Sequence, residues 1–355
     1  MTTKETQLKK TLLAIAIGAT FLAANAALAA PTVYGRFNVA LDSQKDEIGL
    51  DFETSDSTLK LRDNNNSSRL GFKGSEELGV NDLKVIYQLE YGIDPDGSES
   101  NPFSKRNLFV GLQGGFGELK AGFYDTIIKD IGGSVDQFND TIGDITSLMV
   151  GETRASNLIT YTTPKMGDAL DFVVTVQPGE GRVAADDVTD SENSIADSWY
   201  AAMRYDAGIF SGALGYADNQ RSGLKFDGGT VGSDILRATG LLKWESFELG
   251  ALYQMAEGID QSGGAVSGGD FEETSWLLSA AYKVGSWKLK TQYGQTDGDT
   301  SDITRSQIAV GADYKLSKAA TAQVYYVSYE DQDRIIDGIS DPKTDTVGVA
   351  FIYSF

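Results

Sequence analysis

The last twelve residues of the chain, Thr344–Phe355, read T-D-T-V-G-V-A-F-I-Y-S-F. In the second half of this stretch every other position is apolar, and the residues between are mostly small or polar. A period of two is the pattern of a β-strand with one apolar face. We therefore predict a strand with Val349 and Phe351 on its apolar face. Ala350 and Ile352 then face the opposite side.

The aromatic residue Phe355 stands at the very end of this strand. Chain termini usually fray in soluble proteins, so a final aromatic residue is unusual there. In an outer-membrane barrel the last strand must pair with the first, because lipid cannot satisfy an open sheet edge. Aromatic residues also gather at the membrane interfaces of such barrels. The ending therefore favours a transmembrane β-barrel that Phe355 helps to close, and we expect the barrel-insertion machinery to read this residue during assembly.

Residues 1–29 have the composition of a signal peptide. Three lysines at positions 4, 9 and 10 precede an apolar run from Thr11 to Ala24, and Ala27-Leu28-Ala29 supplies a small-x-small cleavage site. We predict export, with residues 30–355 forming one transmembrane β-barrel domain in the outer membrane of a Gram-negative bacterium. No later stretch offers eighteen consecutive apolar residues, so no membrane-spanning helix is expected.

The composition narrows the possible functions. Removing residues 1–29 takes away three lysines and one glutamate, which changes the formal net charge from −21 to −23. Because nucleic acid is also negatively charged, we do not expect it to bind. The acidity of the chain is compatible either with plain solubility or with a channel that favours cations. The chain has no cysteine and no histidine, and it thus lacks thiolate chemistry and the commonest general base and metal ligand. We predict no enzyme, no cofactor and no metal.

Segments of alternating polarity recur along the whole chain, and each is long enough for a tilted membrane crossing. About sixteen such segments are present, and the predicted strands are Thr32–Ser43, Ser67–Gly74, Leu83–Ile93, Lys105–Gly114, Glu118–Thr126, Ala155–Thr163, Ala169–Gln177, Asp197–Tyr205, Phe210–Asp218, Asp234–Trp244, Phe247–Glu257, Thr274–Val284, Trp287–Thr296, Thr304–Leu316, Ala320–Glu330 and Lys343–Phe355.

The connections between these segments differ in length in a regular way. Tight turns such as Glu245–Ser246 and Gly285–Ser286 alternate with long links such as Gln44–Asn66 and Ile127–Arg154. Short turns at one rim and long loops at the other are typical of outer-membrane barrels. The composition of the turns agrees, because aromatic residues flank several of them. These are Trp244, Phe247, Tyr282 and Trp287.

Four motifs carry a resemblance to a known family: Tyr34-Gly35-Arg36-Phe37, Arg69-Leu70-Gly71-Phe72-Lys73-Gly74, Leu108-Phe109-Val110-Gly111-Leu112 and the ending Phe351–Phe355. In this order, and with the signal peptide and the turn rhythm, the mature chain resembles the Gram-negative general diffusion porins. The resemblance implies a homotrimer of sixteen-stranded antiparallel barrels with short periplasmic turns, long external loops and a third long loop folded inward. The Pro-Glu-Phe-Gly-Gly type of signature found in the constriction loop of some relatives is absent.

The third long connection, Ile127–Arg154, contains the segment V-D-Q-F-N-D-T-I-G-D-I at residues 135–145. On a helical wheel its apolar residues gather on one side and Asp136, Asp140 and Asp144 on the other. Gly143 and the aspartates weaken an isolated helix, so a single loose turn or a non-helical fold also fits. We predict that the apolar side rests on the barrel wall while the three aspartates line a pore constriction. An external loop with solvated acids is the alternative.

The resemblance marks Arg36, Arg69, Arg106 and Arg154 as the basic wall opposite that loop. Alternation independently places Arg36 and Arg69 on the inner face of their strands, whereas the alternation around Arg106 and Arg154 is blurred. A solvated charge without a particular role is the alternative for each of them.

We predict a water-filled channel for the passive diffusion of small hydrophilic solutes and ions, with a mild preference for cations. Its partners would be outer-membrane lipid and the diffusing solutes. A substrate-selective channel of the sugar type is one alternative, although no ladder of inward aromatic residues is readable. A structural or adhesive barrel with a closed bore is the other.

Overall fold

The computed structural model describes residues 30–47, 57–180, 182–183, 191–226, 230–260, 271–299, 301–336 and 339–355. The signal peptide predicted at residues 1–29 lies outside the described residues and remains a prediction. None of the helices in the described ranges is long and apolar enough to cross a bilayer.

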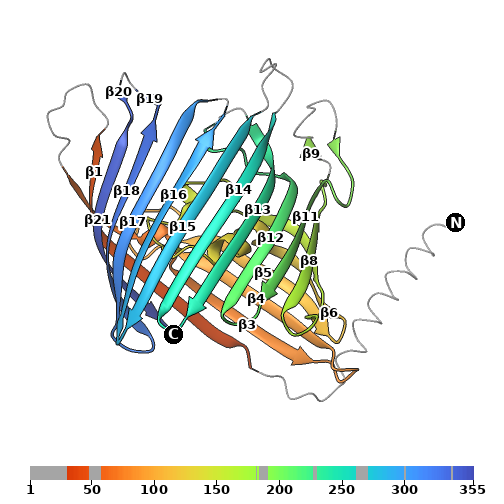
Figure 1. Cartoon of the computed structure of the whole chain (residues 1–355). Coiled ribbons are helices and arrows are strands. Elements are labelled where there is room, and N and C mark those ends of the chain that lie inside the picture. The colour runs from red at the N-terminus through yellow and green to blue at the C-terminus, as the bar shows by residue number, and fades with distance from the viewer. Residues whose placement is uncertain are drawn as a thin grey trace.

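The described chain is built almost entirely of strands (Figure 1). Its elements are β1 (Thr32–Glu47), β2 (Thr58–Asp63), η2 (Asn64–Asn66), β3 (Arg69–Glu77), β4 (Lys84–Ile93), β5 (Phe103–Gly114), β6 (Gly117–Asp125), α2 (Ile127–Gly133), η3 (Ile145–Ser147), β7 (Arg154–Thr162), β8 (Leu170–Gln177), β9 (Arg182–Val183), β10 (Ser191–Glu192), β11 (Ser198–Asp206), β12 (Phe210–Gln220), β13 (Thr230–Trp244), β14 (Phe247–Asp260), β15 (Glu272–Val284), β16 (Trp287–Gly298), β17 (Ile303–Lys315), β18 (Ala320–Gln332), β19 (Ile335–Ile336), β20 (Ile339–Ser340) and β21 (Lys343–Ser354).

The long strands form one antiparallel sheet that closes on itself. β1 pairs with β2 and β3, each strand from β3 to β8 pairs with the next, β8 pairs with β11, each strand from β11 to β18 pairs with the next, and β18 pairs with β21. β9 and β10 form a separate two-stranded sheet. The sheet closes where β21 pairs with β1, in a register that runs from Arg36 opposite Ser354 to Glu47 opposite Lys343. Beyond Ser354, the N–H of Phe355 donates to the carbonyl of Gly35 at 3.0 Å and the N–H of Gly35 donates back at 3.0 Å. The last residue thus completes the seam between the two ends of the sheet.

Two short strands share one position in this barrel. β2 pairs with the second half of β1, and β3 pairs with its first half. Between them lies η2, where Asn65 and Asn66 have φ angles of 51° and 48° and interrupt the pairing. Because β2 and β3 form one interrupted strand, the seventeen strands of the sheet make a sixteen-stranded barrel, as predicted. The prediction of a connection without a strand over Gln44–Asn66 was wrong, since β2 lies within it.

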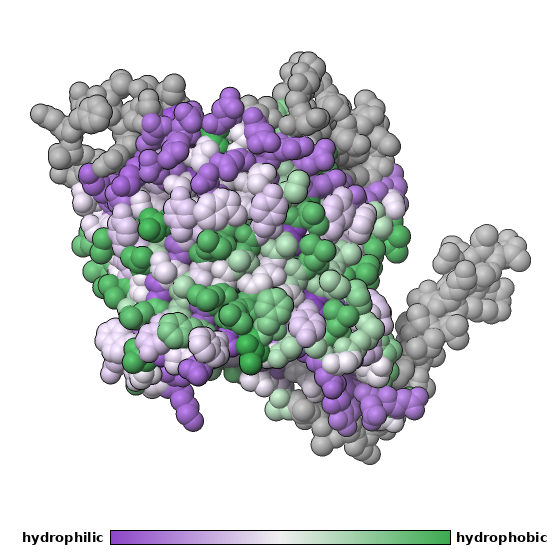
Figure 2. All heavy atoms as spheres, viewed as in Figure 1, coloured by the Kyte–Doolittle hydropathy of each residue, from purple (hydrophilic) through white to green (hydrophobic). Residues whose placement is uncertain are grey.

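The two faces of the strands separate as the alternation predicts. Val349 and Phe351 point outward and are about half exposed, whereas Ala350 points inward and is buried. On the face of the barrel shown in Figure 2, a band of apolar residues lies between two more polar rims. At one rim, aromatic side chains pair across neighbouring strands, with ring centroids 4.6 Å apart for Phe247 and Tyr282 and 4.7 Å apart for Trp287 and Tyr314. This is the interfacial girdle of a membrane barrel.

The outward phase of the strands gives a direct test on β4. Leu89 is 48% exposed on the outer face near the middle of that strand, and its neighbour Gln88 lines an internal cavity. An arginine on the lipid side at mid-membrane depth costs about 2–4 kcal/mol. Leu89→Arg should therefore destabilise the folded barrel by about that amount in a denaturant titration in detergent or lipid, whereas Gln88→Arg should cost much less. Equal losses for the two variants would contradict the assigned phase.

Candidate functional site: an inserted loop and an arginine-bearing wall

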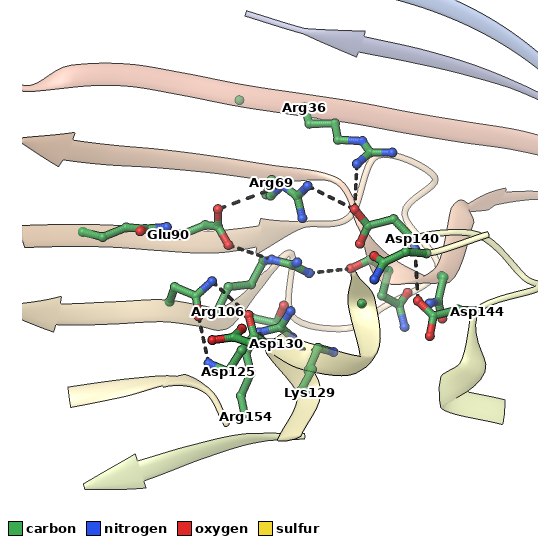
Figure 3. A pocket seen from close by; sticks show the side chains of 18 of the residues that line it. Arg36, Arg69, Glu90, Arg106, Asp125, Lys129, Asp130, Asp140, Asp144 and Arg154 are labelled. Atoms are coloured by element: carbon green, nitrogen blue, oxygen red, sulfur yellow. Dashed lines mark hydrogen bonds and ion pairs between the residues drawn. The ribbon is translucent and has the colours of Figure 1, made fainter. Parts of the chain in front are cut away.

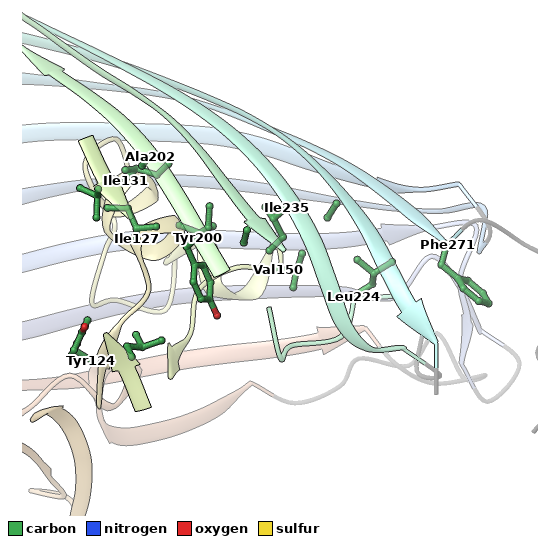
Figure 4. Packing of buried hydrophobic residues seen from close by; sticks show 14 residues of the cluster. Tyr124, Ile127, Ile131, Val150, Tyr200, Ala202, Leu224, Ile235 and Phe271 are labelled. Carbon is green, nitrogen blue, oxygen red and sulfur yellow. The ribbon is translucent and has the colours of Figure 1, made fainter. Parts of the chain in front are cut away.

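The connection between β6 and β7 does not project from the barrel but runs along its inner wall. It begins with α2, whose first turn is capped by Thr126: the N–H of Lys129 donates to the Thr126 hydroxyl. The isoleucines of α2 are buried against residues from β11 and β12 (Figure 4). These contacts fix the direction in which the loop enters the bore.

Two further apolar clusters seat the rest of the loop. Val135, Ile145 and Leu148 pack against leucines of β13, β14 and β15. Phe138 packs against residues of β1, β17, β18 and β21, including Ala350. The loop thus follows the inner wall from β11 around to β1 and leaves the bore open on the side of β1–β7. The predicted seating of the apolar residues on the wall is confirmed.

The segment 135–145 is a series of turns and not a helix. The Asp136 carboxylate accepts hydrogen bonds from the N–H groups of Phe138 at 2.8 Å and Ile145 at 3.1 Å. Asp144 accepts from the N–H of Asp140 at 3.0 Å and from Thr146. Aspartate side chains that bond nearby backbone groups compete with helix formation. Of the conformations left open by the sequence, the non-helical one is therefore found, and α2 precedes this segment.

Arg237 of β13 holds both ends of the loop. Its side chain is completely buried and donates to the carbonyls of Ile128 at 2.9 Å and Val150 at 2.8 Å. It also forms an ion pair with Glu152, whose side chain is buried as well. Two glycines give it room, because a Cβ at Gly132 would lie 2.2 Å from the guanidinium and Gly151 has a φ of 109°. The sequence offered no signal for this role, since Arg237 sits among ordinary inward residues of a strand.

Between the loop and the β1–β7 wall lies a cavity of about 930 Å³ (Figure 3). Six basic and six acidic side chains line it: Arg36, Arg69, Lys73, Arg106, Lys129 and Arg154, with Glu90, Asp125, Asp130, Asp140, Asp144 and Glu152. The arginines come from the wall, and four of the acids come from the loop. Opposite charges therefore face each other across the bore.

Asp140 is the point where the loop meets the wall. Its Oδ2 lies 2.6 Å from Nη1 of Arg36 and 3.1 Å from Nη2 of Arg69. Burial alone would raise the pKa of Asp140, but attraction by Arg69, Arg36 and Arg106 outweighs it and holds this pKa below its ordinary value. Its backbone carbonyl also accepts from the Asn38 amide at 2.7 Å. Asp140 is thus an ionised carboxylate fixed between two arginines.

The other two predicted arginines pair with wall acids that the sequence analysis did not select. Nε of Arg106 lies 2.9 Å from Glu90, and Nε of Arg154 lies 3.0 Å from Asp125. The blurred alternation has a structural cause, because the pairing register shifts beside both arginines. In β5 two residues, Arg106 and Asn107, stand opposite one residue of β4, and a similar bulge interrupts the β6–β7 pairing.

Six of the seven charged residues predicted for the constriction thus line one cavity, and Asp136 does not. Asp136 is buried beneath the loop surface, where its carboxylate holds two backbone N–H groups. Burial and the neighbouring Asp144 raise its pKa. The expectation that Asp136 faces the bore is therefore wrong: helical spacing grouped it with the other two aspartates, but the chain turns between them. Within the described ranges, no cluster of His, Cys, Asp or Glu is placed to hold a metal ion.

A closed sixteen-stranded barrel with an apolar outer band and a charged, loop-narrowed bore is the architecture of an outer-membrane channel. Residues 11–334 match the family described as Gram-negative porin. The chain belongs to this family of non-enzymatic channels of the outer membrane.

Individual relatives agree with this assignment. The chain is 27% identical over 338 residues to the major outer membrane protein P.IB of Neisseria gonorrhoeae, covering 89% of this chain and 92% of that protein. Among solved structures it is similar to an anion-selective porin from Comamonas acidovorans, with a TM-score of 0.75, 23% identity and coverage of 92% and 99%. It is also similar to the trimer form of OmpT from Vibrio cholerae, with a TM-score of 0.64, 17% identity and coverage of 92% and 100%. The two structural likenesses show the shared fold.

The Arg237–Glu152 pair predicts how firmly the loop is held. Removing one partner of a buried ion pair costs about 3–5 kcal/mol, so Arg237→Leu should free the loop and give larger, noisier single-channel currents and new protease cleavage within residues 127–153. Arg237→Leu combined with Glu152→Leu should recover part of the lost order, since no buried charge remains unpaired. The exposed pair of Lys84 and Glu77, 3.5 Å apart, is the control: Lys84→Leu should change little. Wild-type currents in Arg237→Leu would contradict the assignment.

Asp140 gives a second test, on charge. Asp140→Asn removes the carboxylate between Arg36 and Arg69 with almost no change in shape. The reversal potential in a salt gradient should move toward anions, and the shift should be smaller at 1 M than at 0.1 M salt, because the Debye length falls from about 10 Å to about 3 Å. The control is Asp94→Asn in the exposed turn after β4. Equal shifts in the two variants would mean that Asp140 contributes only diffuse charge.

Proposed function

We propose that the protein is a passive diffusion channel for small hydrophilic solutes and ions, with a mild preference for cations. The observation that carries the proposal is the charged cavity of about 930 Å³ between the inserted loop and the wall. Its lining is polar and positions charges on opposite sides. Its described lining residues hold no pair of nucleophile and histidine base, because the chain contains no histidine. The path therefore sorts solutes by size and charge without a catalytic cycle.

The mild cation preference follows from two charge balances. The lining itself has six basic and six acidic side chains, and each of the four wall arginines has a carboxylate partner within about 3 Å. Local charges therefore nearly cancel across the bore. The mature chain as a whole carries a formal charge of −23 once residues 1–29 are removed, and this field attracts cations to both entrances. A diffuse field of one sign with a neutral constriction gives a small selectivity.

An anion-preferring channel is the second candidate. It is favoured by the four arginines on one wall of the cavity and by the likeness to a porin that is described as anion-selective. The ion pairs to Asp140, Glu90 and Asp125 argue against it, because these three carboxylates offset most of the charge of the four arginines. Selectivity therefore depends on whether these pairs persist while solutes pass.

A sugar-type channel is less well supported by the lining. Tyr34 and Phe355 are the aromatic residues among the described residues that line the cavity. Tyr124 is buried, and its hydroxyl donates a hydrogen bond to that of Thr160 at 2.9 Å. A sugar path needs a continuous series of aromatic faces, and two residues do not make one.

We also propose that the chain forms a homotrimer, by its membership in this family and its likeness to a structure described as a trimer form.

The purified protein in a planar bilayer tests these proposals together. We expect steady ohmic steps, and in a tenfold salt gradient a small reversal potential of the sign that indicates cation excess. The potential should shrink as total salt rises, since the field is screened. A potential of the opposite sign would support the anion-preferring channel, and saturable block by one sugar would support the sugar channel. Silence in the bilayer would support a structural or adhesive barrel.

A further inference from the structure

A second segment of the chain folds into the barrel, at the extracellular end. Residues Gly223–Phe226, here called the mouth segment, belong to the connection between β12 and β13. The N–H of Leu224 donates to the Thr230 hydroxyl at 2.8 Å. Leu224 is only 7% exposed and belongs to the same apolar cluster as Val150 of the inserted loop (Figure 4). The segment is therefore packed inside the barrel.

The mouth segment crosses the inner faces of four successive strands. Leu224 leans on Gly258 of β14, where a Cβ would lie 2.8 Å from its Cδ1. The N–H of Phe226 donates to the buried carboxylate of Glu273 on β15 at 2.8 Å. On β16, a Cβ at Gly298 would lie 3.2 Å from the Phe226 ring. The two glycines thus leave hollows in the wall that Leu224 and Phe226 occupy.

Arg305 of β17 connects the mouth segment to the inserted loop. Its guanidinium lies 5.4 Å from the centroid of the Phe226 ring, at a distance typical of a cation–π contact. It donates to the carbonyl of Ser147 in the inserted loop at 3.0 Å. Two further hydrogen bonds, of 2.5 and 2.7 Å, fix it to Asp331 of β18. The same side chain therefore positions both inward-folded segments.

Lys225 is the charged residue of the mouth segment. It stands between Leu224 and Phe226, which face the wall, and it is exposed. Partial desolvation lowers the pKa of its ammonium group, and the nearby charge of Arg305 lowers it further. The carboxylates of Glu273 on the wall and of Glu152 and Asp144 in the inserted loop raise this pKa and oppose the shift. The ammonium group therefore lies within electrostatic reach of the carboxylates of the constriction.

We propose that the mouth segment forms a second narrowing of the path on the extracellular side of the inserted loop, and that Lys225 is a specificity-determining residue there. Its charge weakens the access of cations to the acidic loop and favours solutes that carry a negative group. The inference rests on the proposed channel activity, since a residue can tune selectivity only where ions pass.

Charge variants at Lys225 test the specificity. Lys225→Gln should move the reversal potential in a salt gradient toward cations, and Lys225→Glu should move it about twice as far, because the charge change doubles. The matched control is Lys105→Glu, an exposed lysine that pairs with the outward-facing Tyr91 on β4 and so lies outside the barrel. Equal shifts for Lys225→Glu and Lys105→Glu would overturn the proposal. If the wild-type protein does not conduct at all, the result counts against the channel activity itself and not against the role of Lys225.

A cross-link tests the position of the segment. An ideal Cβ at Gly298 would lie 3.5 Å from the Cβ of Phe226, which is within the range of a disulfide. The chain has no cysteine, so Phe226→Cys with Gly298→Cys should yield a single disulfide under mild oxidation. Ser301→Ala is added because the Ser301 hydroxyl would lie 2.5 Å from that Cβ. The pair Phe226→Cys with Ser104→Cys, on the β5 wall of the cavity, should stay reduced.

The conductance of these variants tests the narrowing. The cross-linked channel should conduct like the wild type, because the disulfide fixes the segment where it already lies. Leu224→Ala with Phe226→Ala should conduct more, since the segment loses the side chains that fill the two wall hollows. Absence of the cross-link, or an unchanged conductance in the double alanine variant, would overturn the proposal.

Discussion

Closure of the sheet between β1 and β21 is the constraint on which the rest of the structure depends. In lipid an unpaired strand edge would leave a row of N–H and C=O groups without partners, at a cost of several kcal/mol for each group. The pairing of the first and last strands removes that edge, and Phe355 extends it by one further pair of hydrogen bonds to Gly35. Once the barrel is closed, every second side chain must face inward, and the bore has to be filled or wetted. The inserted loop fills part of the bore, and the charged cavity is the part that remains open to water.

The inserted loop has little regular structure, so its own backbone groups need partners from the wall. Inward side chains of the strands supply them one by one: Ser279 donates to the carbonyl of Val135, Gln292 and Gln307 donate to that of Gly143, and Tyr329 donates to that of Ile142. Arg237 does the same at the two ends of the loop. A buried polar group without a partner is costly. The loop is therefore held in place by the same physical rule that closes the sheet.

The strands could be predicted because membrane crossing imposes a period of two along the whole chain, and the sixteen predicted segments are the sixteen strand positions. The placement of Arg36 and Arg69 followed from the same period. The period of two failed to place Arg106 and Arg154, because β-bulges near them shift the alternation of inward and outward side chains. Asp136 was misplaced because an acid that caps a turn has the same spacing as one that faces water. The partners Glu90, Asp125 and Arg237 could not be found, since their roles depend on which strands meet the loop and not on local pattern.

The arrangement of charges gives different roles to the two narrowings that we propose. At the proposed constriction, Asp140 lies between Arg36 and Arg69 and offsets part of their charge, so the field of these groups on a passing ion is weaker than that of two free arginines. Lys225 of the mouth segment is exposed, and on our proposal it acts on the ion while the ion is still hydrated. A charge that acts on a hydrated ion changes its local concentration, whereas a paired charge in a narrow bore orients dipoles. On our proposal, selectivity by sign and selectivity by shape are set at two different depths, and Arg305 contacts both segments.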